Sequence, residues 1–232
     1  MQLAIFDIDG TLTNTNTVDA LCFVRALAEE MGIVATESDW AAVTHVTDAA
    51  ITEGIFRRSV GRLPSQEELA RLQDRLVSLL GDCRRRTPEA FAQVQGAGAA
   101  VQRLRSDPGW AVAIASGCWC LSGMMKLHAA EIDFEGIPAA FAEDGVTRED
   151  ILATAVARAC RGYGQGSFSR VVSVGDGVWD LQAARGLGLS FLGVRCDGLV
   201  EALQRHGASH VLRDFSDFGL VLRALEAARV PA

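Results

Sequence analysis

The hydrophobic residues of the chain fall into short runs that are each closed by glycine or a polar residue. Four of these runs have the length of buried strands: Leu3–Phe6, Ala111–Ala115, Val171–Val174 and Phe191–Val194. Ala139–Phe141 is a weaker fifth candidate. Short apolar runs between turn signals are typical of strands that are covered on both faces. The pattern therefore predicts a sheet whose strands are distributed along most of the chain.

Helical patterns separate the later strand candidates. They cover Leu121–Ala130, Asp150–Cys160 and Leu181–Ala184. Strands that alternate with helices are joined by right-handed crossovers, which make the strands parallel and place helices on the faces of the sheet. We therefore expect an α/β fold with a doubly wound, mostly parallel sheet.

The region between residues 15 and 106 breaks this alternation. It has no convincing strand, and its amphipathic helical patterns cover Val18–Met31, Asp39–Arg58 and Ser65–Leu80. Ser65 is a capping candidate at one of the helix starts. We expect residues 1–14 and 107–232 to form the core, with a helical domain at residues 15–106 inserted after the first strand.

The composition narrows the classes of partner. The 232 residues carry a net charge of −7, which disfavours nucleic acid and anionic membranes as partners. No apolar run reaches the ~20 residues of a membrane span, and the first residues lack the pattern of a signal peptide. We expect a cytoplasmic protein, monomeric or homodimeric. Its six cysteines lack paired spacing, which favours reduced thiols over a zinc site.

Acidic side chains stand where two of the predicted strands end. Asp7 and Asp9 follow the first strand and precede Gly10, whereas Asp176 and Asp180 follow the Val171–Val174 strand. In open parallel sheets, ligands bind beyond the carboxyl ends of the strands. The sequence therefore predicts that these four carboxylates converge on one site.

Asp7 and Asp9 are two residues apart at the end of a strand, so both side chains can start on the same side. Close carboxylates repel each other, and with Asp176 nearby a divalent cation is the natural counter-charge. A ligand set made only of oxygen favours magnesium over zinc. With the metal bound, one carboxylate can attack phosphorus while the other moves a proton. The alternative is a set of acids that only caps a turn.

Two further parts of the predicted fold can bind a phosphate: the end of the second strand and the start of a later helix. Ser116 offers a hydroxyl at the end of the second strand, and the Gly117 amide can face an anion at the start of a helix. Alone, this pair is typical of an ordinary turn. Arg148 stands in the first turn of a helix that Thr147 and Asp150 are expected to cap. A cation there opposes the helix dipole, which suggests a binding role, although a solvated arginine is the alternative.

The order of these residues resembles the four motifs of the haloacid dehalogenase superfamily. They are Asp-x-Asp-Gly-Thr from Asp7, then Ser116, then a basic residue before a helix, and last Gly-Asp-x-x-x-Asp from Gly175. The resemblance covers essentially the whole core and implies a Rossmann-like fold. The insert resembles the helical cap of that superfamily. Arg148 departs from the usual pattern, because the third motif is more often lysine.

The resemblance implies a role for each motif residue. Asp7 would be the nucleophile that becomes an aspartyl-phosphate. Asp9 would protonate the leaving group and then activate water. Mg2+ would bind Asp7, the backbone carbonyl of Asp9 and Asp176, with Asp180 a direct or water-mediated partner. The phosphoryl group would be bound by Thr11, Ser116, Gly117 and Arg148.

The same resemblance narrows the reaction. Asp9 disfavours the haloacid dehalogenases, which typically carry an aromatic residue there, and the phosphonoacetaldehyde hydrolases, which carry a small one and use a cap lysine. The insert has no lysine. We expect hydrolysis of a small phosphorylated metabolite, such as a sugar or glycolate phosphate. A phosphomutase and a non-catalytic phosphate-binding regulatory module are the alternatives.

Two expectations concern helical residues outside the motifs. Lys126, the single lysine of the chain, rivals Arg148 for the basic role, but it lies about 15 Å along its helix from Ser116 and we expect it to face solvent or to snorkel. Thr44, Thr47 and Asp48 are expected to share one helix face that contacts a hydroxylated leaving group, with His45 pointing elsewhere.

Overall fold

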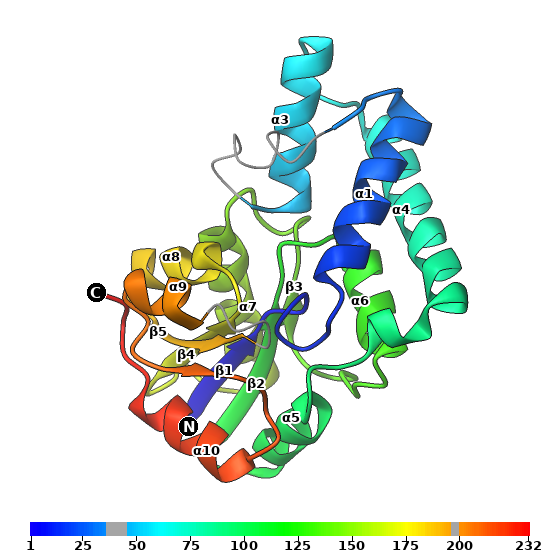
Figure 1. Cartoon of the computed structure of the whole chain (residues 1–232). Coiled ribbons are helices and arrows are strands. Elements are labelled where there is room, and N and C mark those ends of the chain that lie inside the picture. Colours follow the sequence, from blue (N-terminus) through cyan, green and yellow to red (C-terminus); the bar gives the residue numbers. More distant parts are fainter. Residues whose placement is uncertain (36–45, 196–199) are drawn as a thin grey trace.

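Six strands form one open sheet in the computed structural model, which describes residues 1–35, 46–195 and 200–232 (Figure 1). Neighbouring strands all run parallel, in the order β3-β2-β1-β4-β5-β6. The strands are β1 (Gln2–Phe6), β2 (Trp110–Ala115), β3 (Ala139–Ala140), β4 (Val171–Gly175), β5 (Ser190–Val194) and β6 (Val211–Leu212). The parallel sheet predicted from the sequence is confirmed. The short β6 was not predicted, because two residues form no recognisable apolar run.

Strand residues alternate between the two faces of the sheet. Phe6 of β1 packs into the cluster that contains residues of α5 (Ala97–Ser106) and α10 (Phe218–Ala227). Its neighbour Ile5 packs into the cluster that contains residues of α7 (Arg148–Gly162). Successive side chains of a strand point to opposite faces, so a strand covered on both sides is apolar throughout. The sheet is therefore doubly wound, as predicted.

The start of α7 matters for the site, because Arg148 is its first residue. The Thr147 hydroxyl accepts a hydrogen bond from the Asp150 amide at 3.0 Å, and the Asp150 carboxylate accepts one from the Thr147 amide at 3.2 Å. This reciprocal cap confirms the predicted helix start. The other helices of the core are α6 (Cys120–Ala129), α8 (Val178–Gly186) and α9 (Val200–Arg205).

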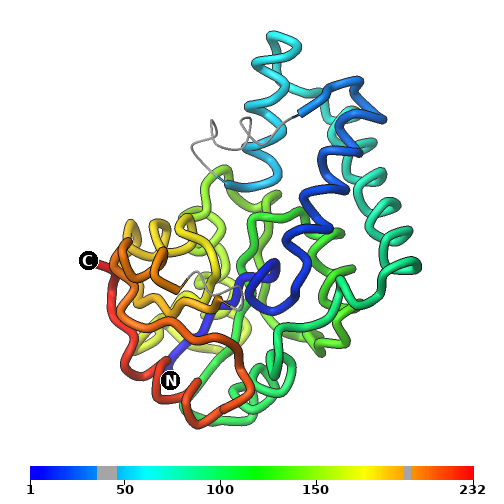
Figure 2. The backbone as a smooth tube through the Cα atoms, in the orientation of Figure 1, coloured from blue at the N-terminus to red at the C-terminus, as the bar shows by residue number. Residues whose placement is uncertain are grey.

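Between β1 and α5 the chain forms a group of helices beyond the carboxyl ends of the strands (Figures 1 and 2). We call this group the helical module. Its buried side chains form a cluster of their own, which Trp119 joins from the core by stacking on Phe23 with ring centroids 5.7 Å apart. The module consists of α1 (Asn16–Met31), α3 (Asp48–Val60), α4 (Gln66–Arg86) and the short η1 (Pro88–Phe91).

Helix α5 lies between the module and β2 in the sequence. The division at residue 106 assigns it to the insert, but its buried residues, such as Val101 and Leu104, belong to the cluster that packs on the sheet. The helices that pack as a separate group therefore end with η1.

The described part of the helix predicted over Asp39–Arg58 begins later than expected. Thr47 is the N-cap of α3, and its hydroxyl accepts a hydrogen bond from an amide of the first turn at 3.1 Å. Thr47 is therefore not on a helix face shared with Asp48, which corrects the sequence-based expectation. Thr44 and His45 lie outside the described residues.

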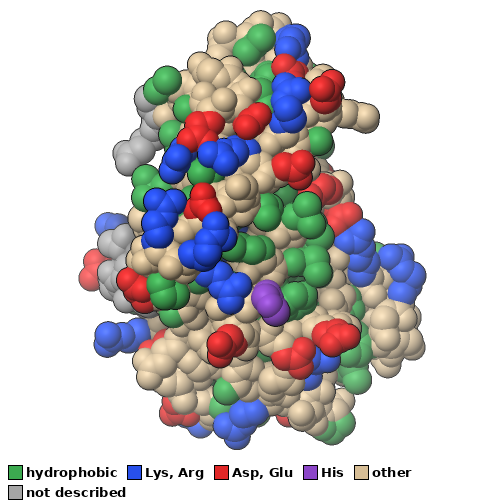
Figure 3. Space-filling model, turned by 90° about the vertical axis from the view of Figure 1, so that its right-hand side faces the viewer, with side chains coloured by type: hydrophobic (Ala, Val, Ile, Leu, Met, Phe, Trp, Pro, Cys, Tyr) green, Lys and Arg blue, Asp and Glu red, His purple; other side chains and the backbone are tan. Residues whose placement is uncertain are grey.

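The surface of the module carries interspersed charges. Figure 3 views the side of the molecule on which α1 and α4 lie, and it shows basic and acidic side chains next to one another. Arg25 is 2.7 Å from Glu29, which Arg75 also contacts. Exposed pairs of this kind contribute about 0–1 kcal/mol each to stability. Among the described residues, no helix has the length and apolar character that a membrane crossing requires.

Candidate active site

The ends of β1, β2 and β4 bring the predicted motif residues to one edge of the sheet. Asp7 follows β1, Ser116 follows β2 and Asp176 follows β4. Gly10 permits a close approach between two of these ends: its φ is +76°, and a Cβ atom there would lie 2.2 Å from Asp176 Oδ2. The same carboxylate oxygen accepts a hydrogen bond from Asn16 Nδ2 at 3.0 Å. A side chain at residue 10 would therefore push the turn after β1 away from the end of β4.

Three carboxylates form the centre of the site. Oxygen atoms of Asp7, Asp176 and Asp180 lie within 4.8 Å of one another, and all three residues are buried. Burial raises the pKa of Asp7 and, more strongly, that of Asp180. Burial and the charge of Asp7 raise the pKa of Asp176 to about 7. Carboxylates that are buried together resist ionisation, because each charge is poorly solvated and repels the others.

A divalent cation fits this acid cluster. Asp7 Oδ1 and Asp176 Oδ1 are buried and accept no hydrogen bond from the described residues, whereas buried polar atoms normally have a partner. Carboxylate oxygens are the ligands that magnesium prefers, and the cluster contains no imidazole or thiolate that would favour zinc. The donor set therefore fits Mg2+.

Arg148 lies against the acid cluster from the first turn of α7. Its Nη1 atom is 2.5 Å from Asp180 Oδ1 and 3.5 Å from Asp7 Oδ1. Its Nε atom donates a hydrogen bond to the backbone oxygen of Val46 at 2.9 Å. Burial opposes the guanidinium charge, but the neighbouring carboxylates outweigh it and raise the pKa of Arg148. Arg148, whose side chain is 13% exposed, is thus a counter-ion of the cluster and not a solvated arginine.

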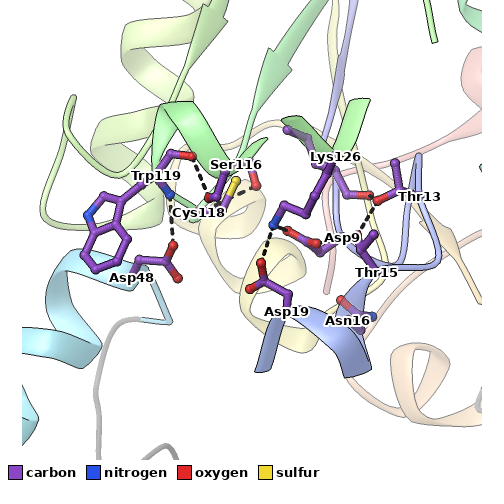
Figure 4. A network of polar contacts seen from close by, with 12 residues as sticks. Asp9, Thr13, Thr15, Asn16, Asp19, Asp48, Ser116, Cys118, Trp119 and Lys126 are labelled. Atoms are coloured by element: carbon purple, nitrogen blue, oxygen red, sulfur yellow. Dashed lines mark hydrogen bonds and ion pairs between the residues drawn. The ribbon is translucent and has the colours of Figure 1, made fainter. Parts of the chain in front are cut away.

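The side chain of Asp9 belongs to a second network, shown in Figure 4. Its Oδ1 accepts a hydrogen bond from the Thr15 hydroxyl at 2.5 Å, and its Oδ2 accepts one from the Lys126 ammonium at 2.5 Å. Lys126 Nζ also donates to Asp19 Oδ1 of α1 at 2.8 Å. One lysine of the core therefore connects a motif residue to the first helix of the module.

The expectation that Lys126 faces solvent is wrong, because its side chain is fully buried. Burial disfavours the ammonium charge, but Asp19 and Asp9 outweigh it and raise the pKa of Lys126 well above its usual value. The helical pattern around residue 126 could not reveal two acidic partners that come from other parts of the chain. The available signal was Asp19, an acid near the start of an otherwise apolar helical run.

A cavity of about 350 Å³ lies between the sheet edge and the helical module. Asp7 and Asp180 line a small adjoining cavity, and Ser116 and Arg148 line both. Thr11 lines neither, and its buried hydroxyl has no hydrogen-bond partner among the described residues. The charged and polar residues of the larger cavity are Asp9, Asn16, Asp19, Thr47, Asp48, Ser116, Arg148, Asp176 and Arg195.

The sequence did not single out Arg195 as a site residue. It directly follows β5, and its Nη1 donates a hydrogen bond to the backbone oxygen of Asp176 at 2.8 Å. The sequence contained a signal for Arg195, because the strand before it was predicted and ligands of parallel sheets bind beyond the carboxyl ends of strands. Applied to every strand, that rule would have found Arg195.

Asp48 reaches the cavity from the start of α3. Its Oδ2 accepts a hydrogen bond from the Trp119 amide at 2.9 Å, and its own amide donates to the backbone oxygen of Gly117 at 2.7 Å. These bonds fix the first turn of α3 on the loop that follows β2. Burial and the charge of Asp19 raise the pKa of Asp48 well above its usual value.

The protein is an α/β protein with a parallel sheet, and buried aspartates follow the ends of β1 and β4. This combination of fold and site is the one expected of the hydrolase superfamily whose motifs the sequence resembles. A family model of haloacid dehalogenase-like hydrolases matches residues 1–188. The chain therefore belongs to the haloacid dehalogenase-like hydrolases, as the motifs implied.

Solved structures share the fold over nearly the whole chain. A hydrolase from Pseudomonas syringae matches with a TM-score of 0.73 and 20% identity, covering 96% of this chain and 98% of that one. A provisionally assigned β-phosphoglucomutase from Bacteroides vulgatus matches with a TM-score of 0.68 and 18% identity, covering 98% and 89%. CbbY from Rhodobacter sphaeroides, solved in complex with phosphate, matches with a TM-score of 0.64 and 18% identity, covering 94% and 96%. No curated protein matches the sequence.

Proposed function

We propose that the chain hydrolyses a small phosphomonoester with the help of magnesium, through an aspartyl-phosphate on Asp7. One observation carries this proposal: Asp7 Oδ1 and Asp176 Oδ1 are buried without hydrogen-bond partners in a carboxylate cluster that also contacts Arg148. A cation bound to these oxygens and an anion bound beside Arg148 would complete the site. The phosphoryl group of a substrate supplies that anion.

In the first half-reaction, a carboxylate oxygen of Asp7 forms a bond to phosphorus as the ester oxygen leaves. The departing oxygen takes a proton from Asp9, which lines the cavity where the leaving group would lie. Arg148 stabilises the charge on the phosphoryl oxygens. Magnesium bound by Asp7 and Asp176 would neutralise the charges that otherwise keep the carboxylate and the phosphoryl group apart.

In the second half-reaction, the Asp9 carboxylate takes a proton from the water that attacks phosphorus. Inorganic phosphate leaves, and the Asp7 carboxylate is restored. Thr15 and Lys126 each bind one oxygen of Asp9, so the side chain keeps its orientation between the two steps. We propose that the helical module is the cap of this enzyme, which covers the cavity and limits the access of bulk water.

A phosphomutase is the second candidate. In that reaction the aspartyl-phosphate passes its phosphoryl group to a second hydroxyl of a sugar and not to water. The similarity in fold to the provisionally assigned β-phosphoglucomutase supports this candidate. Both reactions use the same first half-reaction, so they differ only in the acceptor.

We expect phenyl phosphate to be hydrolysed in the presence of MgCl2, to be inert in excess EDTA, and to be hydrolysed again when magnesium is restored. Release of inorganic phosphate measures this. Phosphorus NMR with a hexose monophosphate separates the two candidates, because a mutase yields a new phosphoester and a hydrolase yields free phosphate. Undiminished turnover in EDTA would defeat the assignment of the metal, and phosphate binding without turnover of any ester would defeat catalysis.

We expect magnesium to stabilise the protein more at pH 8 than at pH 5. The pKa of Asp176 is about 7 in the folded chain, because of burial and the charge of Asp7, against about 3.9 in an unfolded chain. As the pH rises from 4 to 7, the unfolded chain loses this proton first. The folded chain keeps the proton up to about pH 7, so the free energy of unfolding falls between about pH 4 and pH 7. A bound cation offsets the loss, because it favours the ionised carboxylates.

Thermal melts at pH 5 and pH 8, each with MgCl2 and with EDTA, measure this effect without relying on activity. Asp176→Asn removes the titrating group, so we expect it to reduce the magnesium shift at pH 8 and to flatten the pH dependence in EDTA. A magnesium shift of the same size at both pH values would contradict the assignment of Asp176 as a ligand.

A further inference from the structure

We infer that the leaving group of the substrate carries a hydroxyl or an ammonium group and not a carboxylate or a second phosphate. This inference rests on the proposed phosphatase function. It follows from the part of the cavity that the helical module forms, beyond the acid cluster.

The positive side chains that line the cavity come from the core. Among the described residues they are Arg148 and Arg195, and both contact the acid cluster, Arg195 through the backbone oxygen of Asp176. Their charge therefore serves the phosphoryl end. The module contributes the carboxylates of Asp19 and Asp48, and none of its described basic residues lines the cavity.

Two of the carboxylates near the module share one buried cation (Figure 4). Lys126 pairs directly with Asp9 and Asp19, whereas Asp48 accepts the Trp119 amide and forms no ion pair with the described residues. The wall of the cavity that the module forms therefore carries acidic side chains and no basic side chain of its described residues. A carboxylate or phosphate on the leaving group would lie beside these acids, where no basic side chain of the module's described residues can pair with it.

Asp48 supplies an acceptor for a donor group. It is only 8% exposed, it lines the cavity, and the Trp119 amide donates to its Oδ2 and holds the side chain in place. A hydroxyl or an ammonium group can donate to this carboxyl group, and an ammonium group also favours its ionised form. Phe23 and Ile51 line the same cavity with apolar surface, which suits a short carbon chain between the donor and the ester oxygen.

Three esters of matched size test the inference: 2-aminoethyl phosphate, 2-hydroxyethyl phosphate and phosphoglycolate. They share a phosphoryl group and a two-carbon leaving group, and they differ in the terminal ammonium, hydroxyl or carboxylate. We expect kcat/KM for the first two to exceed that for phosphoglycolate by about tenfold or more, the scale of one partly screened charge contact. Phosphoglycolate turned over as well as either of the others would overturn the inference.

Asp48→Asn keeps the shape of the side chain but replaces the carboxyl group by an amide, which cannot ionise to pair with an ammonium group. We expect the ratio of kcat/KM between 2-aminoethyl phosphate and phosphoglycolate to fall about fivefold or more. Glu53→Gln is the matched control, because Glu53 lies on the same helix and does not line the cavity. It should leave the ratio unchanged. An unchanged ratio in folded Asp48→Asn protein would remove Asp48 from this role, and the ranking by the wild-type protein still tests the inference if the variant does not fold.

Failure of the proposed function looks different from failure of this inference. If phenyl phosphate and all three esters release no phosphate with magnesium, the phosphatase proposal fails. Binding of the three esters to the Asp7→Asn variant, measured by calorimetry, then decides the inference. Weaker binding of phosphoglycolate than of the other two supports it, and binding of equal strength, or none, overturns it.

Discussion

Asp7→Asn should abolish turnover of every phosphomonoester while the protein keeps its fold. An amide oxygen is a poor nucleophile toward phosphorus and a poorer ligand for magnesium than a carboxylate. Loss of a nucleophile is among the largest single-residue effects known in enzymes, so we expect kcat to fall by at least about 10³-fold. Stability should not fall, because burial already raises the pKa of Asp7 and a neutral side chain removes one of three crowded charges.

Phosphate release and thermal melts of the purified variant measure the two halves of this expectation. Asp74→Asn is the matched control, since Asp74 is an exposed acid of α4 outside the cavity, and it should retain wild-type activity. A folded Asp7→Asn protein with activity within tenfold of wild type would remove Asp7 from its role. Asp9 would then be the remaining carboxylate of the first motif to test.

The sheet could be predicted because each central strand is covered on both faces. Val172 and Val174 face one side of the sheet and pack on the same cluster, and helices cover both sides, so the strands are almost wholly apolar. The ends of such runs are sharp, which also located Asp7 and Asp176 at the sheet edge. Ligands of open parallel sheets bind beyond the carboxyl ends of the strands, so the strand ends alone locate the site, and side-chain packing need not be known.

The second network could not be predicted in the same way. Lys126 meets Asp9 and Asp19 only after α6 and α1 have packed, and neither helix carries a local pattern that specifies its partner. Thr47 shows that helix starts are hard to predict. Helix α3 begins at Asp48, so Thr47 is its N-cap. An error of a few residues in the start of a helix changes which side chains are expected to share a face. The sequence fixes residue types, but their roles here depend on tertiary contacts.

Arg148→Ala should lower kcat/KM by about 10²-fold or more, the usual scale for the loss of one electrostatic contact to a transition state. The structure adds a second effect. Arg148 is the counter-ion of Asp180 and Asp7 and also donates to the Val46 backbone oxygen, so the variant should lose stability as well. Arg148→Lys should recover part of the activity, because lysine restores the charge. It cannot restore both contacts, since its single ammonium replaces a planar group with several donors.

Inhibition by inorganic phosphate separates Arg148 from its rival Lys126. Arg148 contacts the cluster where the phosphoryl group would bind, whereas Lys126 contacts Asp9 and Asp19 and does not line the cavity. Arg148→Ala should therefore weaken phosphate inhibition about tenfold or more. Lys126→Gln should lower kcat through Asp9 and leave the inhibition constant for phosphate nearly unchanged. Thermal melts establish that both variants are folded. If Lys126→Gln weakens phosphate inhibition more than Arg148→Ala does, the basic residue of the third motif has been misassigned.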